Sequence, residues 1–269
     1  MRLSTLRGMK CRALLVLIAM FGASTAGVAV AEGERYVALG DSYSAGTGAG
    51  GHYGSCYRSR KAYPRLWAQA NQPASFAFAA CGGATTDTVI AKQVNALADD
   101  TTLVTITIGG NDVGFGSVMR TCTLGSDRAC LDRVAQGVAA TEQVLPAKLD
   151  AAYRAIEERA PRARVVVLGY PHLFAHGPTS CGMSLTKRTA LNAAADKLNA
   201  VIAARAGAAG LRFEPVTDDF AGHGVCTSRP WINGVVLFPV IASYHPNAEG
   251  QRHGYLRALT GAVASTRPA

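Results

Sequence analysis

The sequence of 269 residues is poor in aromatic side chains and contains no run of basic residues. Phe, Trp and Tyr make up 7% of the chain, and the formal net charge of +9 is spread along it. Proteins that bind nucleic acid usually gather Lys and Arg on one stretch or face and interleave aromatic side chains that stack on bases. Here basic residues occur as isolated pairs, such as Arg162 with Arg164, so nucleic-acid binding is disfavoured.

Closely spaced metal-binding cysteines are also lacking. The sequence has no C-x-x-C motif and no His at ligand spacing beside a Cys, which disfavours a zinc site, and we expect neither a metal nor an organic cofactor. Apart from Cys11 there are six cysteines, an even number that is typical of oxidised, exported proteins. Sequence alone leaves their pairing open, and nearest-neighbour pairing is the simplest set: Cys56–Cys81, Cys122–Cys130 and Cys181–Cys226.

No apolar run long enough to cross a bilayer follows residue 31. The first residues instead have the layout of a secretory signal, with basic residues before the apolar run 13–23 and the small residues Ala29 and Ala31 before Glu32. Cys11 precedes the apolar run, so it is not placed as a lipid-attachment cysteine. We therefore expect a signal peptide over 1–31 and a secreted domain over 32–269 without stable membrane insertion; an uncleaved anchor is the alternative.

Apolar strand patterns alternate with helical patterns along the rest of the chain. Strands are predicted at 36–39, 76–80, 103–108, 164–168 and 212–216, and helices at 62–69, 86–98, 131–159 with a break at Pro146, 185–206 and 249–263. This alternation is typical of a parallel sheet covered by helices on both faces. The sequence therefore predicts one α/β domain with three α/β/α layers and a central parallel sheet, and no repeat or linker divides it.

Three loops that directly follow predicted strands have unusual content. They are Gly-Asp-Ser at 40–42, Cys-Gly-Gly-Ala-Thr-Thr at 81–86 and Gly-Gly-Asn-Asp at 109–112. Loops at the carboxyl ends of parallel strands gather along one crevice, so we expect these three to meet. A hydroxyl, glycine N–H groups and an Asn amide are the groups that acyl transfer requires, namely a nucleophile and donors for an oxyanion.

A base for the serine comes from the C-terminal part of the sequence. His245 stands directly before Pro246 and a predicted helix, which is a rigid position from which an imidazole can point into the crevice. The other histidines lack such surroundings.

The four blocks together resemble the GDSL, or SGNH, hydrolase family, and most closely its secreted, three-disulfide actinobacterial lipases and esterases. The resemblance spans the chain after the signal and implies a flavodoxin-like three-layer fold. It also implies that Ser42 is the nucleophile and His245 the general base. The oxyanion hole would consist of the N–H groups of Ser42 and Gly83 and the side-chain amide of Asn111, with Gly82 as the alternative second donor.

One position departs from the family pattern. Members commonly place an Asp three residues before the histidine to hold the imidazole, and this chain has Ala242 there. A backbone carbonyl can accept the same Nδ1–H bond. We therefore predict a Ser–His dyad in which the Ala242 main-chain oxygen orients His245, with Asp218 and Asp219 as outside candidates for a remote carboxylate.

Two further groups of residues have a structural and a functional reading. Asp41 and Asp112 are predicted to bind nearby backbone N–H groups, because a carboxylate in a turn does so more often than it catalyses. Five aromatic residues are candidates for an acyl pocket, although core packing is the more common fate of such side chains: Tyr53, Tyr57, Trp67, Phe115 and Trp231.

The predicted function is two-step hydrolysis of acyl esters by a secreted, monomeric lipase or esterase that acts on a small-molecule or lipid ester. The same core residues are compatible with deacetylation of sugar polymers such as acetylated xylan, and with acyl transfer to an alcohol. A non-catalytic lipid- or glycan-binding module is the alternative from a different class of protein. Such a module would not need a serine aligned with a histidine, which argues against it.

Overall fold

The computed structural model describes residues 33–177 and 182–265. The predicted signal peptide and Cys181 lie outside the described residues. The centre of the domain is a five-stranded sheet in the order β4-β1-β5-β6-β7, and every pairing in it is parallel. The bounds of these strands are β1 Arg35–Ala38, β4 Ser75–Phe78, β5 Leu103–Ile106, β6 Arg164–Leu168 and β7 Arg212–Glu214.

Continuous apolar strands occupy the middle of the sheet. All four residues of β5 are buried, as are the last four of β6, because helices cover both faces at these positions. The edge strand β7 is only partly buried and correspondingly carries Arg212 and Glu214. The central strands β5 and β6 are therefore continuously apolar, whereas the edge strand β7 carries charged side chains.

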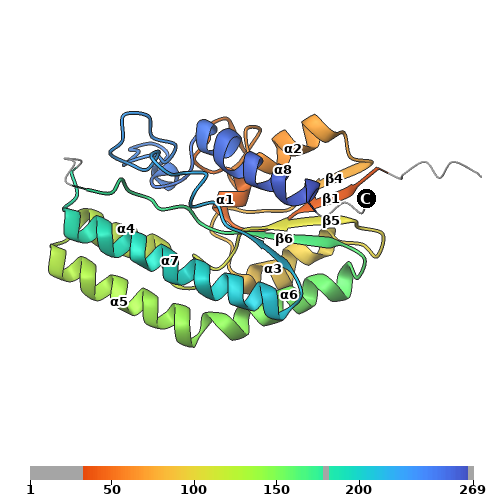
Figure 1. Cartoon of the computed structure of the whole chain (residues 1–269), viewed down its shortest axis with the longest axis horizontal. Helices are drawn as coiled ribbons and strands as arrows, with labels where there is room; N and C mark the ends of the chain where they lie inside the picture. The colour runs from red at the N-terminus through yellow and green to blue at the C-terminus, as the bar shows by residue number, and fades with distance from the viewer. Residues whose placement is uncertain (1–32, 178–181, 266–269) are drawn as a thin grey trace, which may run out of the picture. The chain divides into compact units, whose positions relative to one another are not determined.

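Helices form two layers, one on each face of the sheet (Figure 1). On one face lie α2 (Tyr63–Asn71) and α8 (Leu256–Ala264), which also contact each other. On the other lie α3 (Thr86–Lys92), α6 (Leu145–Arg159) and α7 (Leu185–Ala208), with α5 (Asp127–Gln143) packed against α7. The predicted three-layer α/β/α fold is confirmed.

The break predicted near Pro146 is present: α5 and α6 meet at Val144, and Pro146 lies in the first turn of α6, where its missing N–H costs nothing. Two other elements differ from the sequence prediction. The predicted last helix begins as a π-helical segment, η3 (Gly250–Tyr255), that continues into α8. An additional helix, α4 (Phe115–Leu124), follows the third loop.

Short elements connect these parts. The strands β2 (His52–Tyr53) and β3 (Arg58–Ser59) form an antiparallel pair, and 3-10 turns occupy η1 (Gln93–Ala96) and η2 (Val240–Ala242). Disulfides join Cys56 to Cys81 and Cys122 to Cys130, as nearest-neighbour pairing predicts. Within the described ranges, no helix combines the length and hydropathy that a membrane span needs.

Candidate active site

The turn after β1 places the hydroxyl of Ser42 at the carboxyl edge of the sheet. After β1, the N–H groups of Leu39 and Asp41 donate to the backbone oxygens of Thr105 in β5 and of Thr107 just beyond it. The four-residue helix α1 (Ser42–Ala45) then begins. Gly40 has φ of +120°, and a Cβ at this position would lie 2.5 Å from the Thr107 oxygen. Only glycine fits so close an approach of two backbones. Glycine before the Asp-Ser pair is therefore required by packing against Thr107.

Asp41 has a structural role in this turn, as predicted. Its carboxylate caps α1 by accepting a hydrogen bond from the Tyr43 N–H at 2.9 Å, and it accepts a second bond from the Tyr170 hydroxyl at 2.5 Å. Burial raises the pKa of Asp41 to about 7, and the two hydrogen bonds oppose that shift. The carboxylate thus holds the N-terminus of α1.

His245 meets Ser42 although 203 residues separate them along the chain. The Nε2 atom of His245 lies 2.6 Å from the Ser42 Oγ, and Nδ1 lies 2.9 Å from the backbone oxygen of Ser243. A carbonyl oxygen only accepts hydrogen bonds, so Nδ1 carries the proton and Nε2 is the acceptor for the serine hydroxyl. Burial lowers the pKa of His245 from 6.5 to about 4, which keeps the imidazole neutral at neutral pH.

The prediction that the Ala242 carbonyl orients His245 is wrong. Tyr244 has φ of +59°, and this left-handed residue tightens the chain so that the carbonyl two positions before the histidine faces Nδ1. The Ala242 oxygen instead accepts a hydrogen bond from the Asn233 side chain at 3.1 Å. Asp219, one of the outside candidates, pairs with Arg257, and both ring nitrogens of His245 already have other partners.

Several backbone contacts hold the loop that carries His245. The Asn233 N–H donates to the His245 oxygen at 2.9 Å, and its side-chain amide donates to the Gly48 oxygen at 2.9 Å. Gly48 touches the histidine directly, since a Cβ there would lie 2.7 Å from the His245 Cβ. No local pattern in the sequence marks Asn233 or Gly48, because their role arises from contacts across the fold.

The two adjacent glycines of the second loop differ in the state of their N–H groups. The Gly82 N–H donates to the Cys56 oxygen at 2.9 Å, a contact that the Cys56–Cys81 disulfide keeps in place. Within the described part of the chain, the Gly83 N–H has no acceptor, and Gly83 adopts φ of +80° with open space around it. The N–H that remains available to a ligand is therefore that of Gly83.

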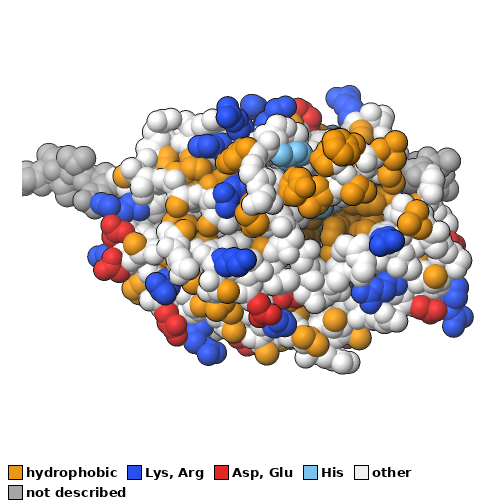
Figure 2. Space-filling model, turned by 180° about the vertical axis from the view of Figure 1, so that it is seen from behind, with side chains coloured by type: hydrophobic (Ala, Val, Ile, Leu, Met, Phe, Trp, Pro, Cys, Tyr) orange, Lys and Arg blue, Asp and Glu red, His pale blue; other side chains and the backbone are white. Residues whose placement is uncertain are grey.

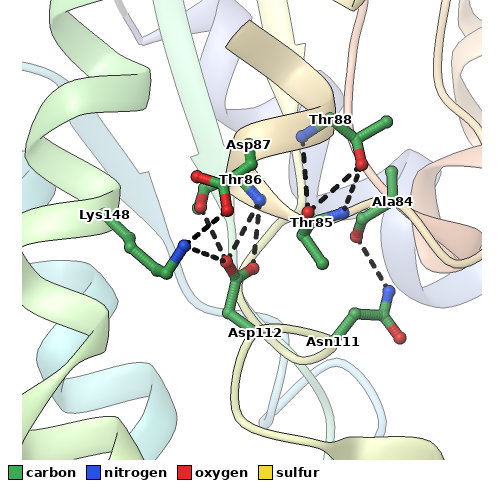
Figure 3. A network of polar contacts seen from close by, with 8 residues as sticks. All are labelled: Ala84, Thr85, Thr86, Asp87, Thr88, Asn111, Asp112 and Lys148. Carbon is green, nitrogen blue, oxygen red and sulfur yellow. Dashed lines mark hydrogen bonds and ion pairs between the residues drawn. The ribbon is translucent and has the colours of Figure 1, made fainter. Parts of the chain in front are cut away.

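Asn111 and Asp112 extend from the third loop toward the second, as Figure 3 shows. The Asn111 amide nitrogen donates one hydrogen bond to the Ala84 oxygen at 2.9 Å, which leaves its second N–H unused by that bond. The buried Asp112 carboxylate accepts from the N–H and the hydroxyl of Thr86, the first residue of α3, at 3.1 and 2.7 Å. Asp112 thus joins the two loops, in keeping with its predicted structural role.

The catalytic candidates share one open cleft of about 520 Å³. Ser42, Gly83, Asn111 and His245 all line it. The remainder of its wall comes from α4 and from the segment before η3, and its side chains are chiefly apolar: Phe115, Met119, Leu124, Val235, Val240 and Ile241, together with Arg120, Thr123 and Tyr244. A nucleophile, a base and two kinds of N–H donor therefore converge on an apolar cleft that is large enough for an ester substrate.

Comparisons with known proteins agree with this geometry. Residues 38–253 match the model of the GDSL-like Lipase/Acylhydrolase family. The chain belongs to this family. It is 49% identical to Lipase 1 of Streptomyces coelicolor, over 91% of this chain and 93% of that protein. The predicted resemblance and the predicted class, a carboxylic-ester hydrolase, are confirmed.

Two solved structures share the fold closely. An extracellular lipase from Streptomyces rimosus is 51% identical with a TM-score of 0.83, and phospholipase A1 from Streptomyces albidoflavus NA297 is 47% identical with the same TM-score. Each comparison covers 85% of this chain and 99% of the other.

Tyr170 supports the candidate active site, although the sequence does not reveal this role. It follows β6, and its hydroxyl donates to Asp41 and accepts from the Gly110 N–H at 3.0 Å. The first and third loops are thereby joined through one buried side chain. Of the aromatic candidates for an acyl pocket, Phe115 lines the cleft, whereas Trp67 is buried in the core.

Proposed function

We propose that this protein is a secreted lipase or esterase that hydrolyses acyl esters with a Ser42–His245 dyad. The observation that carries the proposal is the 2.6 Å contact between the Ser42 Oγ and the His245 Nε2. The orientation of the imidazole by the Ser243 carbonyl supports it, because the unprotonated nitrogen then faces the serine. A non-catalytic binding module would not need this alignment.

In the first step, Ser42 attacks the carbonyl carbon of the ester while His245 takes the hydroxyl proton at Nε2. The carbonyl oxygen becomes negative and is bound by the N–H groups of Ser42 and Gly83 and by the Asn111 amide. Collapse of the tetrahedral intermediate breaks the bond to the alcohol, and His245 returns its proton to that oxygen. The result is an acyl-enzyme on Ser42 and free alcohol.

In the second step, a water molecule loses a proton to His245 and attacks the acyl carbon. The same donors bind the second oxyanion, the bond to the Ser42 Oγ breaks, and the serine recovers its proton from His245. During both steps the Ser243 carbonyl stabilises the imidazolium in place of the carboxylate of a triad. Every proton transfer in the two steps thus passes through His245.

The apolar wall of the cleft favours lipid acyl esters as substrates. A lipase and a phospholipase A1 among the similar proteins support this assignment. The alternative is deacetylation of a sugar polymer, which would need polar groups along the cleft to bind the sugar. A series of p-nitrophenyl esters of increasing acyl length, measured beside acetylated xylan, separates the two: we expect turnover of medium and long acyl esters and little acetate release from xylan.

Secretion as a monomer completes the proposal. The N-terminal sequence pattern supports export, and the similar Streptomyces rimosus protein is described as extracellular. Paired cysteines agree with an oxidising compartment.

Covalent labelling tests the assignment of the nucleophile. A fluorophosphonate reacts with an activated serine hydroxyl, so we expect the mature protein to gain one label, located on Ser42 by mass spectrometry of its peptides. His245→Ala, which removes the base, is expected to label far more slowly. A label on another serine, or none on an active enzyme, would overturn the proposal.

Activity should persist to an unusually acidic pH. Because burial lowers the pKa of His245 to about 4, the imidazole remains able to accept the serine proton until the pH falls to that value. We expect the protonation of His245 to lower kcat/KM only below about pH 4, as measured by chromatography of the released acid. A midpoint near 6.5, the ordinary value, would contradict this expectation.

Stability must be followed in the same experiment. The unfolded state takes up the His245 proton near pH 6.5 and the folded state only near pH 4, so this group lowers the free energy of unfolding as the pH falls through that window. Circular dichroism at each pH separates loss of the base from acid unfolding.

Asn111→Ala is expected to lower kcat by about 10²- to 10³-fold with a small change in KM, because an amide that binds the oxyanion acts in the transition state. The substitution also removes the bond to the Ala84 oxygen, so thermal unfolding is measured in parallel. Asn71→Ala, which removes an Asn side chain on α2 whose amide bonds to the Trp67 oxygen, is the matched control and should retain full turnover. Unchanged kcat in folded Asn111→Ala would remove Asn111 from the oxyanion hole.

A further inference from the structure

Five large hydrophobic side chains around the mouth of the cleft are exposed to solvent. They form what we call the apolar rim, and their exposed fractions are 77% for Leu124, 57% for Val235, 90% for Leu237, 93% for Phe238 and 71% for Val240. Soluble proteins seldom gather such side chains in one patch unless it binds something. The rim comes from only two segments, the end of α4 and the loop 235–240.

The rim is continuous with the catalytic cleft. Leu124, Val235 and Val240 line the cleft together with Ser42 and His245. Leu237 and Phe238 do not line it and are almost fully exposed beyond its edge. On the face seen in Figure 2, hydrophobic side chains gather around a hollow. Anything that covers the rim therefore also covers the entrance to the nucleophile.

Hydrogen bonds close the base of the loop that carries Leu237 and Phe238. The Ser243 hydroxyl accepts from the Val236 N–H at 2.9 Å and bonds to the Val236 oxygen at 3.2 Å. The Asn233 amide closes the base of the loop on the Ala242 oxygen. Leu237 and Phe238 lie between these contacts, and their side chains are exposed.

The charge of the two segments fits the surface of a lipid bilayer. Residues 113–126 and 230–248 contain no Asp or Glu and one charged side chain, Arg120, which lines the cleft. A surface that enters the boundary between headgroups and acyl chains needs apolar side chains at its tip, and a cation beside them is attracted to lipid phosphates. Carboxylates, which such phosphates would repel, are absent from both segments.

We propose that the apolar rim docks the enzyme on a phospholipid bilayer. Leu237 and Phe238 enter the acyl layer, Arg120 faces the phosphates, and the mouth of the cleft lies at the depth where the ester groups are found. The inference rests on the proposed function, since it assigns the cleft a substrate that is presented at a lipid surface. It identifies the loop 235–240 as the part of the chain that contacts this surface.

Sedimentation with vesicles of phosphatidylcholine and phosphatidylglycerol tests the docking. The protein is used as Ser42→Ala, so that hydrolysis of lipid during the measurement is negligible. Burial of one Leu or Phe side chain contributes enough to change partitioning by about tenfold or more. We therefore expect Leu237→Ser combined with Phe238→Ser to lower the vesicle partition coefficient at least about tenfold.

Val144→Ser is the matched control. Val144 is 49% exposed but lies where α5 meets α6 and does not line the cleft. We expect this variant to bind vesicles as the unchanged protein does. In an otherwise native chain, the double rim variant should hydrolyse a water-soluble short ester at the unchanged rate, which shows that it is folded. Equal vesicle binding by the double variant, or equal loss in the control, would overturn the proposal.

A positive signal comes from Phe238→Trp, whose fluorescence should shift to the blue when vesicles are added. An unshifted emission would contradict entry of this side chain into the bilayer. Equilibrium sedimentation without lipid tests whether a second copy of the chain covers the rim instead. If the protein is a dimer that the double rim variant dissociates, and no vesicle binding is found, the rim is a subunit interface and the proposal is overturned. Retained turnover in Ser42→Ala would refute the proposed catalytic serine and leave these binding results interpretable.

Discussion

Ser42→Ala is expected to lower kcat for ester hydrolysis by about 10⁴- to 10⁶-fold, the largest effect of any substitution considered. Without the Oγ no acyl-enzyme forms, and the neutral imidazole of His245 has no hydroxyl to activate. The N–H donors and the cleft remain, so binding and a small residual rate persist. The measurement is turnover of a short p-nitrophenyl ester by the purified variant, with the thermal unfolding midpoint compared with the unchanged protein.

Ser44→Ala supplies a matched control from the same short helix. The Ser44 hydroxyl is buried, bonds to the Tyr63 hydroxyl at 3.1 Å and accepts from the Thr107 N–H at 3.1 Å. Its removal leaves a buried N–H without an acceptor and should lower the free energy of unfolding by about 1–3 kcal/mol, while turnover remains high. A combined Ser42→Ala and His245→Ala variant should be no slower than Ser42→Ala alone, because the two residues act as a unit. Substantial turnover by folded Ser42→Ala would end the case for the dyad.

Gly48→Ala is expected to lower kcat by about 10²-fold, although Gly48 takes no part in the chemistry. A Cβ at this position would lie 2.5 Å from the Pro246 oxygen and 2.7 Å from the His245 Cβ, and contacts this short force the backbone apart. The His245 loop must then move away from Ser42, and a displacement of about 1 Å is enough for such a loss. We also expect overpacking to lower the free energy of unfolding by about 1–3 kcal/mol.

The control for Gly48→Ala is Gly207→Ala near the end of α7, where a Cβ would meet no atom within 4 Å. That variant should keep full turnover and gain up to about 1 kcal/mol of stability, since alanine is the better helix former. Turnover of both variants is measured on the same soluble ester, and the rate of fluorophosphonate labelling reports the Ser42–His245 contact directly. Full activity in Gly48→Ala would contradict this prediction, because it would show that the added Cβ does not displace His245 from Ser42.

Much of the fold could be predicted because buried parallel strands are short, apolar runs that end at glycine. The runs that form β5 and β6 have this pattern, and their expected bounds agree with the structure to within two residues. The helix α4 was missed because its sequence, FGSVMRTCTL, contains a glycine and two threonines and lacks a strong helical pattern. Its stability comes from packing on α5 and from the Cys122–Cys130 disulfide.

The orienting carbonyl shows why details of the site were beyond sequence reasoning. Counting back from His245 by the spacing of family members leads to Ala242, but the left-handed backbone of Tyr244 and the bond from Asn233 to the Ala242 oxygen bring Ser243 into place. Neither a positive φ at a tyrosine nor a contact with a residue nine positions earlier is encoded in the local pattern.

The amino-acid sequence alone determined which groups are available for catalysis. They are a serine after one strand, glycines and an asparagine after two other strands, and a histidine before a proline. These follow from short-range rules, because strand ends, turns and helix starts depend on a few neighbouring residues. Only the tertiary structure decided that the Gly83 N–H is available while that of Gly82 is not, that Ser243 holds His245, and that hydrophobic side chains surround the cleft. Each of these three features depends on contacts between segments that are distant in the sequence. The order of the strands and the packing of the loops bring these segments together, and the segments then compete for the same hydrogen-bonding groups.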